Sequence, residues 1–149
     1  MTRRILIVGA GLAGMWSALV AARFREQTSL ADDAFEIVVV APQPYLHIRP
    51  RLYEFDPSTM QVDLRPIFDA VNAEYVQGAV QNIAVNRNCT AVLTLDGSQS
   101  TLNFDRLVLA SGSRLFRPEI LGLAQHGFSV DQGGNPGGGR SGQDFRRLA

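Results

Sequence analysis

Three glycines near the start of the chain have the spacing of a phosphate-binding turn. Gly9, Gly11 and Gly14 belong to the run Gly9-Ala10-Gly11-Leu12-Ala13-Gly14. The first glycine of such a run permits a sharp turn, the second lets a pyrophosphate approach the backbone, and the third allows close packing of a helix. The free N–H groups of that helix then attract phosphate oxygens. We therefore predict that residues 9–14 bind the pyrophosphate of a dinucleotide.

The segments around the glycines support this prediction. Arg3 to Val8 is a short, branched, apolar run typical of a buried strand, and residues from about Gly11 to about Glu26 favour a helix. Residues 27–34 are polar and predict a loop, and residues 35–40 predict a second buried strand. A strand, a helix and a strand in this order form a βαβ unit with adjacent, parallel strands.

The charge-free stretch from Ile5 to Ala22 also has a competing interpretation. It follows Arg3 and Arg4, as the apolar part of a signal peptide or a short membrane span would. Its three glycines and the absence of a clear cleavage site followed by a cysteine-paired domain argue against both. We expect no integral membrane segment and a cytoplasmic location.

Composition narrows the functional classes. The 149 residues suffice for one domain with a core, and a net charge of zero gives no electrostatic case for nucleic acid. The single cysteine, Cys89, excludes an internal disulfide and a redox dithiol. We assign no metal ligands.

The second predicted strand ends without the acid that commonly binds an adenosine ribose. Ala41 occupies that position, followed by Pro42 and Gln43. Loss of a charged hydrogen-bond acceptor costs roughly 1–3 kcal/mol of binding. Gln43 could replace it in part, and no arginine follows directly to favour a 2′-phosphate.

The next segment, residues 44–54, carries a family resemblance. Tyr45, Pro50 and Tyr53 match a loop of the form Tyr-His-x-Phe-x-Pro-x-x-Tyr, although Leu46 replaces the histidine and Ile48 the phenylalanine. The chain here resembles the FAD-binding part of the pyridine nucleotide-disulfide oxidoreductase superfamily, with the type-II NADH dehydrogenase branch as the nearest match. The resemblance implies that Arg49 and Pro50 border the flavin. Ordinary loop roles for His47, Arg49 and Arg51 stay open.

The second half of the chain extends the resemblance. We expect a short helix over 64–71, a strand over 75–80 that leads into 81–83, and a hairpin of 90–95 and 102–106 around the Asp96-Gly97 turn. Residues 107–110 predict a strand that ends in Ala110-Ser111-Gly112, similar to the family's second FAD signature, Ala-Thr-Gly. The family also implies a contact between the backbone near Val80 and the adenine. A nucleophilic Ser111 fits poorly, because Ala-Ser-Gly-Ser is not a Gly-x-Ser-x-Gly elbow.

These patterns together predict an α/β chain: a Rossmann-like βαβ FAD-binding domain with a small antiparallel β-meander, incomplete. The resemblance covers Thr2 to Asp131, so we define 1–131 as a partial FAD/NAD(P)-binding domain. Residues 132–149 are rich in glycine and predict a disordered tail. The abrupt change at residue 132 predicts a truncated or frameshifted product, because full-length members of the family continue into a second G-x-G-x-x-G domain.

The resemblance implies a function in flavin chemistry. We expect the FAD-binding segment of an NAD(P)H-dependent flavin oxidoreductase, with NAD(P)H as the substrate of full-length members and a quinone or a protein as electron acceptor. A catalytically inert nucleotide-binding fragment and a simple NAD-binding Rossmann module are the alternatives. Whether the chain is itself an enzyme stays open, because it lacks the NAD(P)H domain.

Overall fold

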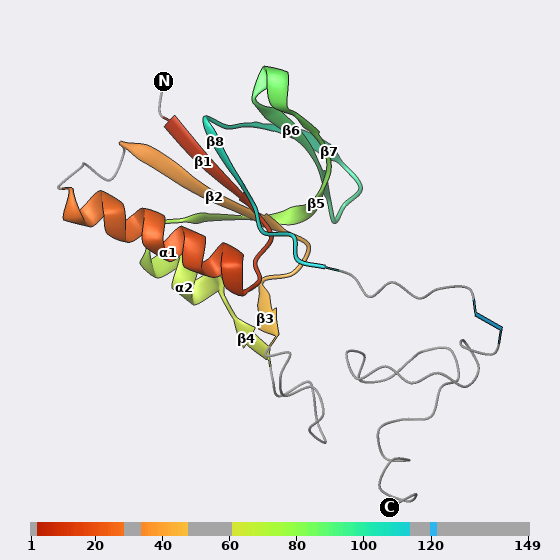
Figure 1. Cartoon of the computed structure of the whole chain (residues 1–149), viewed down its shortest axis with the longest axis horizontal. Helices are drawn as coiled ribbons and strands as arrows, with labels where there is room; N and C mark the ends of the chain where they lie inside the picture. Colours follow the sequence, from red (N-terminus) through yellow and green to blue (C-terminus); the bar gives the residue numbers. More distant parts are fainter. Residues whose placement is uncertain (1–2, 29–33, 48–60, 114–119, 122–149) are drawn as a thin grey trace, which may run out of the picture. The chain divides into compact units, whose positions relative to one another are not determined.

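The computed structural model describes residues 3–28, 34–47, 61–113 and 120–121 of the chain (Figure 1). Its contacts define one compact unit, formed by Met1–Leu46 and Asp63–Gly112. A second unit contains His47–Val62 and Ser113–Ala149, of which few residues are described. The predicted tail over 132–149 lies outside the described residues, as do Arg49 and Pro50.

A six-stranded sheet with the order β7-β6-β5-β2-β1-β8 organises the first unit. β1 (Arg3–Val8) runs parallel to β2 (Phe35–Ala41) on one side and to β8 (Arg106–Leu109) on the other. The first part of β5 (Glu74–Ala84) lies parallel to β2. The predicted βαβ unit is therefore confirmed, with α1 (Leu12–Gln27) as its helix.

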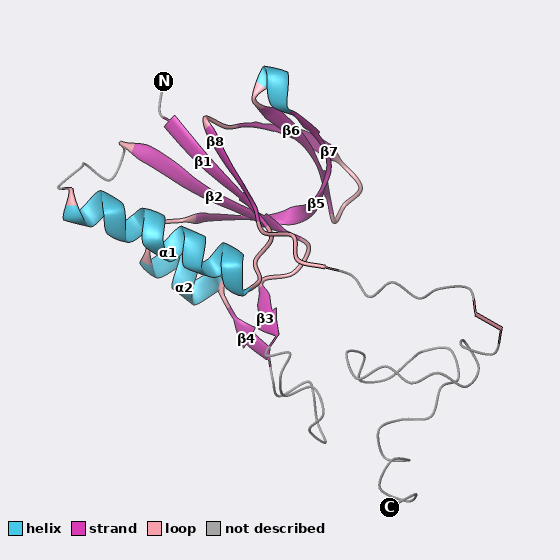
Figure 2. Cartoon of the chain, in the orientation of Figure 1, coloured by secondary structure: helices cyan, strands magenta, loops and turns pink. Residues whose placement is uncertain are grey.

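The second part of β5 leaves the parallel sheet and begins an antiparallel meander (Figure 2). It pairs with β6 (Cys89–Thr94), which pairs in turn with β7 (Gln99–Asn103). The parallel pairing of β5 ends at Gln77 and the antiparallel pairing begins at Gly78. A register shift between Val80 and Asn82 follows within the antiparallel part, as bulges commonly do where a strand bends. The 3₁₀ turn Val85–Arg87 joins β5 to β6, and Gly97, at φ +81°, occupies the predicted hairpin turn.

The parallel strands are covered on both faces, which explains their nearly continuous apolar sequence. α1 and α2 (Arg65–Ala70) lie on one face, where Ile7, Val39 and Phe68 are fully buried. Figure 1 shows the meander curving over the opposite face. There Leu6, Val38, Val40 and Val92 form a second apolar cluster.

Two details differ from the sequence-based prediction. The returning strand of the hairpin, expected over 102–106, is β7 at Gln99–Asn103. β3 (Tyr45–His47) and β4 (Gln61–Asp63) form a separate two-stranded sheet, whereas the sequence indicated a loop over 44–54 and predicted no element over 61–63. Strands of three residues beside prolines are too short to show an alternating pattern. The backbone N–H of buried Leu64 donates to Pro44 O at 2.8 Å, so the chain returns next to the point where it left the sheet.

Candidate functional site

Most of the predicted site residues lie at the carboxyl ends of the parallel strands. This end of the sheet, and not an edge strand, is what the term sheet edge means for the site. The glycine run follows β1, Ala41 ends β2, and Ala110 follows β8. α1 leads from β1 to β2, whereas β8 lies on the opposite side of β1. Ligands of open α/β sheets bind beyond the carboxyl ends, where the strand order reverses in this way.

Gly9 and Gly14 make the close approach of loop, helix and strand possible. Gly9 has a φ of +108°, and its N–H donates to Val40 O at 2.8 Å. A Cβ on Gly9 would overlap the carbonyl group of Ala110, with 2.6 Å to its carbon. A Cβ on Gly14 would overlap the carbonyl group of Gly9, with 2.9 Å to its carbon. Both glycines are therefore required by packing within the protein itself.

Gly11 is different, because no atom of the described residues lies within 4 Å of the position that its Cβ would take. Its φ of −72° is open to any residue, so backbone geometry does not require a glycine here. Gly11 is the N-cap of α1, and no side chain caps that end. The first turn of α1 contains no acidic residue, which leaves the partial positive charge of the helix end unopposed. An anion could approach the backbone at this point.

The other members of the run fall into two groups. Ala10 is buried in the helix-side core, whereas Leu12 and Ala13 are exposed on the first turn of α1. Residues 11–13 are therefore exposed at the sheet edge. This arrangement suits contacts made by main-chain N–H groups.

The end of β2 is fixed by side chains of β5 that the sequence did not single out. The Tyr75 hydroxyl donates to Ala41 O at 2.7 Å, and the Gln77 side-chain amide donates to Pro42 O at 3.0 Å. Burial raises the pKa of the Tyr75 hydroxyl above its usual value, which favours the protonated donor. Neither contact could be read from the sequence, because both depend on the pairing of Val39 with Tyr75 in the β2–β5 register.

The two candidates for ribose binding, Ala41 and Gln43, differ in their exposure to solvent. Ala41 is only 4% exposed, and its methyl group packs in the helix-side core. Gln43 is exposed two residues later. The amide of Gln43 is thus the accessible polar group of this pair.

Val80 lies beyond the parallel part of β5, at the start of the bulge. It pairs with Val92 and packs half-buried against the meander-side core. Its side chain therefore has a structural role. A backbone contact with adenine stays a prediction.

The second signature lies beside the glycine run, as its position after β8 requires. The Ala110 N–H donates to Val8 O at 2.8 Å, and Ser111 and Gly112 are exposed. Gly112 has a φ of +72°, a conformation that favours glycine, and no atom of a described residue lies within 4 Å of its Cβ position. Ala110-Ser111-Gly112 can thus contribute a second stretch of accessible backbone to the edge.

Comparison with known proteins gives the family of the chain and similar structures. The family model for pyridine nucleotide-disulphide oxidoreductases matches residues 3–136. The chain belongs to this family. Two NADH dehydrogenase-like proteins of Mycobacterium tuberculosis, from strains CDC 1551 and H37Rv, are each 35% identical to it over 128 residues. The resemblance to the NADH dehydrogenase branch is thereby confirmed.

The matched region covers only part of those relatives. It includes 86% of this chain but 31% of each M. tuberculosis protein. The structure of NDH2 from Plasmodium falciparum in complex with NADH superposes with a TM-score of 0.67 at 16% identity, over 85% of this chain and 25% of that one. An NAD-dependent persulfide reductase from A. fulgidus gives a TM-score of 0.65 at 21% identity, over 87% and 25%. These two likenesses confirm the Rossmann-like α/β fold.

Several of the expectations fall outside the described residues or gain no direct test. Arg49 and Pro50 are not described, and His47 is described only as the end of β3. Among the described residues, no helix is long and apolar enough to cross a membrane. The same residues contain no cluster of three His, Cys, Asp or Glu side chains suited to a metal ion.

Proposed function

We propose that this chain is the FAD-binding segment of an NAD(P)H-dependent, NADH dehydrogenase-like flavin oxidoreductase. The observation that carries the proposal is the open space at Gly11, on the uncapped N-terminus of α1. Packing explains Gly9 and Gly14, but a ligand that needs the backbone is the best reason for glycine at position 11. Family membership and the two M. tuberculosis relatives support a flavin as that ligand.

In this proposal each segment at the sheet edge holds one part of FAD. The N–H groups of residues 11–13 bind the pyrophosphate, and the Ala110-Ser111-Gly112 backbone supports its second side. Gln43 contacts the ribose, the backbone near Val80 contacts the adenine, and Arg49 and Pro50 border the flavin. When bound, FAD supplies the group that accepts a hydride from NAD(P)H. The chain contributes binding, orientation and a positive helix end.

The electron acceptor and the location also remain proposals. A quinone or a protein acceptor suits this branch, and one solved neighbour is a sulfide:quinone oxidoreductase from Aquifex aeolicus. We keep a cytoplasmic location as a prediction. Turnover further requires a nicotinamide site, which we expect in the length of the relatives that the chain does not match.

A catalytically inert nucleotide-binding fragment is the second candidate function. The observation that favours it is the coverage of 31% of the relatives' length. A chain of this kind would hold FAD without oxidising NADH. A simple NAD-binding module would instead bind NADH more tightly than FAD.

A binding experiment separates these candidates. The full 149-residue chain is purified, incubated with FAD, freed of unbound ligand and examined for the flavin absorption bands. We expect retained FAD that a large excess of NADH does not displace. NADH-dependent dye reduction then distinguishes an active chain from an inert one. A folded chain that binds NADH but not FAD would contradict the proposal.

A further inference from the structure

An arginine of α2 lies near the end of β2, where the neighbouring sequence contains none. Arg65 begins α2 and directly follows Leu64, whose backbone N–H donates to Pro44 O at 2.8 Å. Pro44 is the third residue after Ala41, the last residue of β2. The chain thus returns beside the end of β2 and brings Arg65 with it. The residues that directly follow Ala41 could not reveal this cation.

The charge of Arg65 acts on the side chain that holds the end of β2. The Tyr75 hydroxyl donates to Ala41 O at 2.7 Å. Burial raises the pKa of this hydroxyl, and the positive charge of Arg65 opposes the rise. Salt screens exposed charges over about 10 Å, so an effect of this kind requires proximity. Arg65 is therefore close to the position where the second strand meets a ligand.

The guanidinium of Arg65 is oriented by Asp63 and keeps donors for a ligand. Its Nε donates to both carboxylate oxygens of Asp63, at 3.1 and 3.0 Å, and its Nη2 donates to Oδ2. A guanidinium has five N–H groups, so donors remain on Nη1 and Nη2. Within the described part of the chain, Nη1 has no hydrogen-bond acceptor. The Arg65 side chain is 55% exposed, and its remaining donors suit the oxygens of a phosphate.

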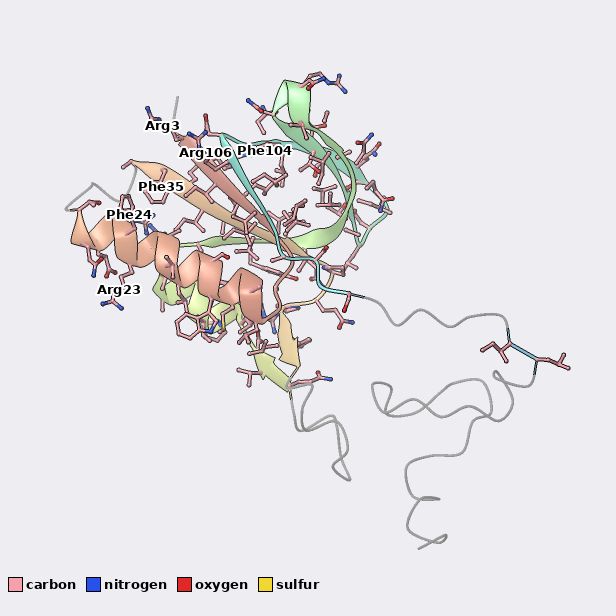
Figure 3. The ribbon with its side chains drawn as sticks, viewed as in Figure 1. Arg3, Arg23, Phe24, Phe35, Phe104 and Arg106 are labelled. Carbon is pink, nitrogen blue, oxygen red and sulfur yellow. The ribbon has the colours of Figure 1, made fainter. Side chains whose placement is uncertain are left out.

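Other arginines lie away from the end of β2. Figure 3 shows Arg3 and Arg106 at the amino ends of β1 and β8, whereas Ala41 is at a carboxyl end of the same sheet. Arg87 ends the 3₁₀ turn of the meander. A phosphate bound beyond β2 would therefore meet Arg65 rather than these three residues.

Ala41 leaves the ribose site without a group that would repel a phosphate. In dinucleotide sites of this kind, an acid at the end of the second strand binds the ribose 2′-hydroxyl, and an arginine nearby accommodates a 2′-phosphate instead. A carboxylate at position 41 would repel that phosphate, because like charges at short range disfavour each other. Ala41 carries no charge, and Arg65 supplies a cation from α2. The site therefore has both features that favour a 2′-phosphate.

We propose that Arg65 makes this ribose site selective for a 2′-phosphate, so that without FAD the chain binds NADP+ in preference to NAD+. The inference rests on the proposed function, which places the adenosine ribose beyond β2. FAD carries a 2′-hydroxyl and no 2′-phosphate at this ribose. Its retention therefore depends on the glycine run and not on Arg65, and bound FAD excludes NADP+ from the site.

Calorimetric titration of the FAD-free 149-residue chain with NADP+ and with NAD+ tests the proposal. We expect NADP+ to bind at least about tenfold more tightly, with a ratio that falls at higher salt. Arg65→Gln should bring the two affinities within about twofold of each other, whereas Arg65→Lys keeps the charge and should retain part of the preference. Arg87→Gln is the matched control, because it removes an exposed arginine from the meander and should leave the ratio unchanged.

Two further comparisons locate the phosphate. Adenosine 2′,5′-bisphosphate should bind more tightly than its 3′,5′ isomer, and Ala41→Glu should weaken NADP+ more than NAD+. Circular dichroism must show that each variant is folded, and FAD binding is measured in parallel. A chain that retains FAD but binds NADP+ and NAD+ equally overturns this inference alone. A preference for NADP+ that persists in Arg65→Gln also overturns it. A folded chain that binds neither FAD nor NADP+ contradicts the proposed function as well.

Discussion

Replacing Gly11 with serine separates cofactor binding from folding. Gly11 has φ −72° and ψ −173°, the extended conformation that serine adopts at a helix N-cap. Within the described part of the chain, no atom lies within 4 Å of the added Cβ. The substitution therefore places two new heavy atoms where we propose that the pyrophosphate binds, without disturbing the protein around them.

The expected magnitudes for Gly11→Ser differ strongly between the two properties. Serine and glycine differ by only a few tenths of a kcal/mol as N-caps, so the melting temperature should change by roughly 1–2 °C. Loss of one hydrogen bond to a charged phosphate costs about 1.5–3 kcal/mol. The Kd for FAD should therefore rise between about tenfold and 150-fold.

Calorimetric titration with FAD and thermal denaturation, monitored by circular dichroism, measure both quantities. Gly14→Ala is the contrasting variant, because its Cβ would overlap the carbonyl group of Gly9. We expect it to lower the free energy of unfolding by about 1–3 kcal/mol or more and to weaken FAD binding as well. If Gly11→Ser binds FAD within twofold of the unsubstituted chain, the assignment of the open space to pyrophosphate is wrong.

Three further predictions concern the end of β2 and the end of α1. Ala41→Glu should tighten FAD binding about tenfold by restoring a charged ribose acceptor, whereas Ala41→Gln should gain less; unchanged affinity in a titration would refute the ribose argument. Tyr75→Phe removes the donor to Ala41 O and should cost about 1 kcal/mol in urea denaturation. Burial raises the pKa of the Tyr75 hydroxyl above the ordinary 10.0. The unsubstituted chain should therefore lose stability as the pH rises from about 10 through that raised pKa. This loss should be smaller in Tyr75→Phe, which has no hydroxyl to titrate. Arg25 is 4% exposed, and its guanidinium donates to Phe35 O and Val71 O. Arg25→Lys should therefore lower the free energy of unfolding by about 1–3 kcal/mol in urea denaturation. A loss below about 0.5 kcal/mol would contradict a role for the two donors of the guanidinium.

The sequence predicted the elements whose signals are local. The glycine run and the branched apolar residues before it determined β1 and the start of α1 to within one residue. Val38, Val39 and Val40 indicated a strand buried on both faces, and the structure places them between the helices and the meander. The Asp96-Gly97 turn likewise predicted the hairpin of β6 and β7, although β7 begins at Gln99, three residues before the expected strand.

The parts that the sequence did not predict depend on contacts between distant segments. β3 and β4 are too short to show a period, and they form only because the chain returns to pair with itself. The charge-free length of α1 suggested a membrane or signal segment as an alternative. Its small residues instead pack on the sheet, and its large apolar residues form an exposed ridge, a division that becomes visible only once the sheet is in place.

Ala41 shows how the two kinds of information combine. The sequence reveals that an acid is missing, which suggested a weakened ribose site. The structure adds that the carbonyl of the same residue accepts the Tyr75 hydroxyl, and that Gln77 holds the following carbonyl of Pro42. The backbone at the end of β2 is therefore positioned by β5, independently of any cofactor. It follows that the missing carboxylate should reduce FAD affinity while leaving the backbone geometry of the sheet edge intact.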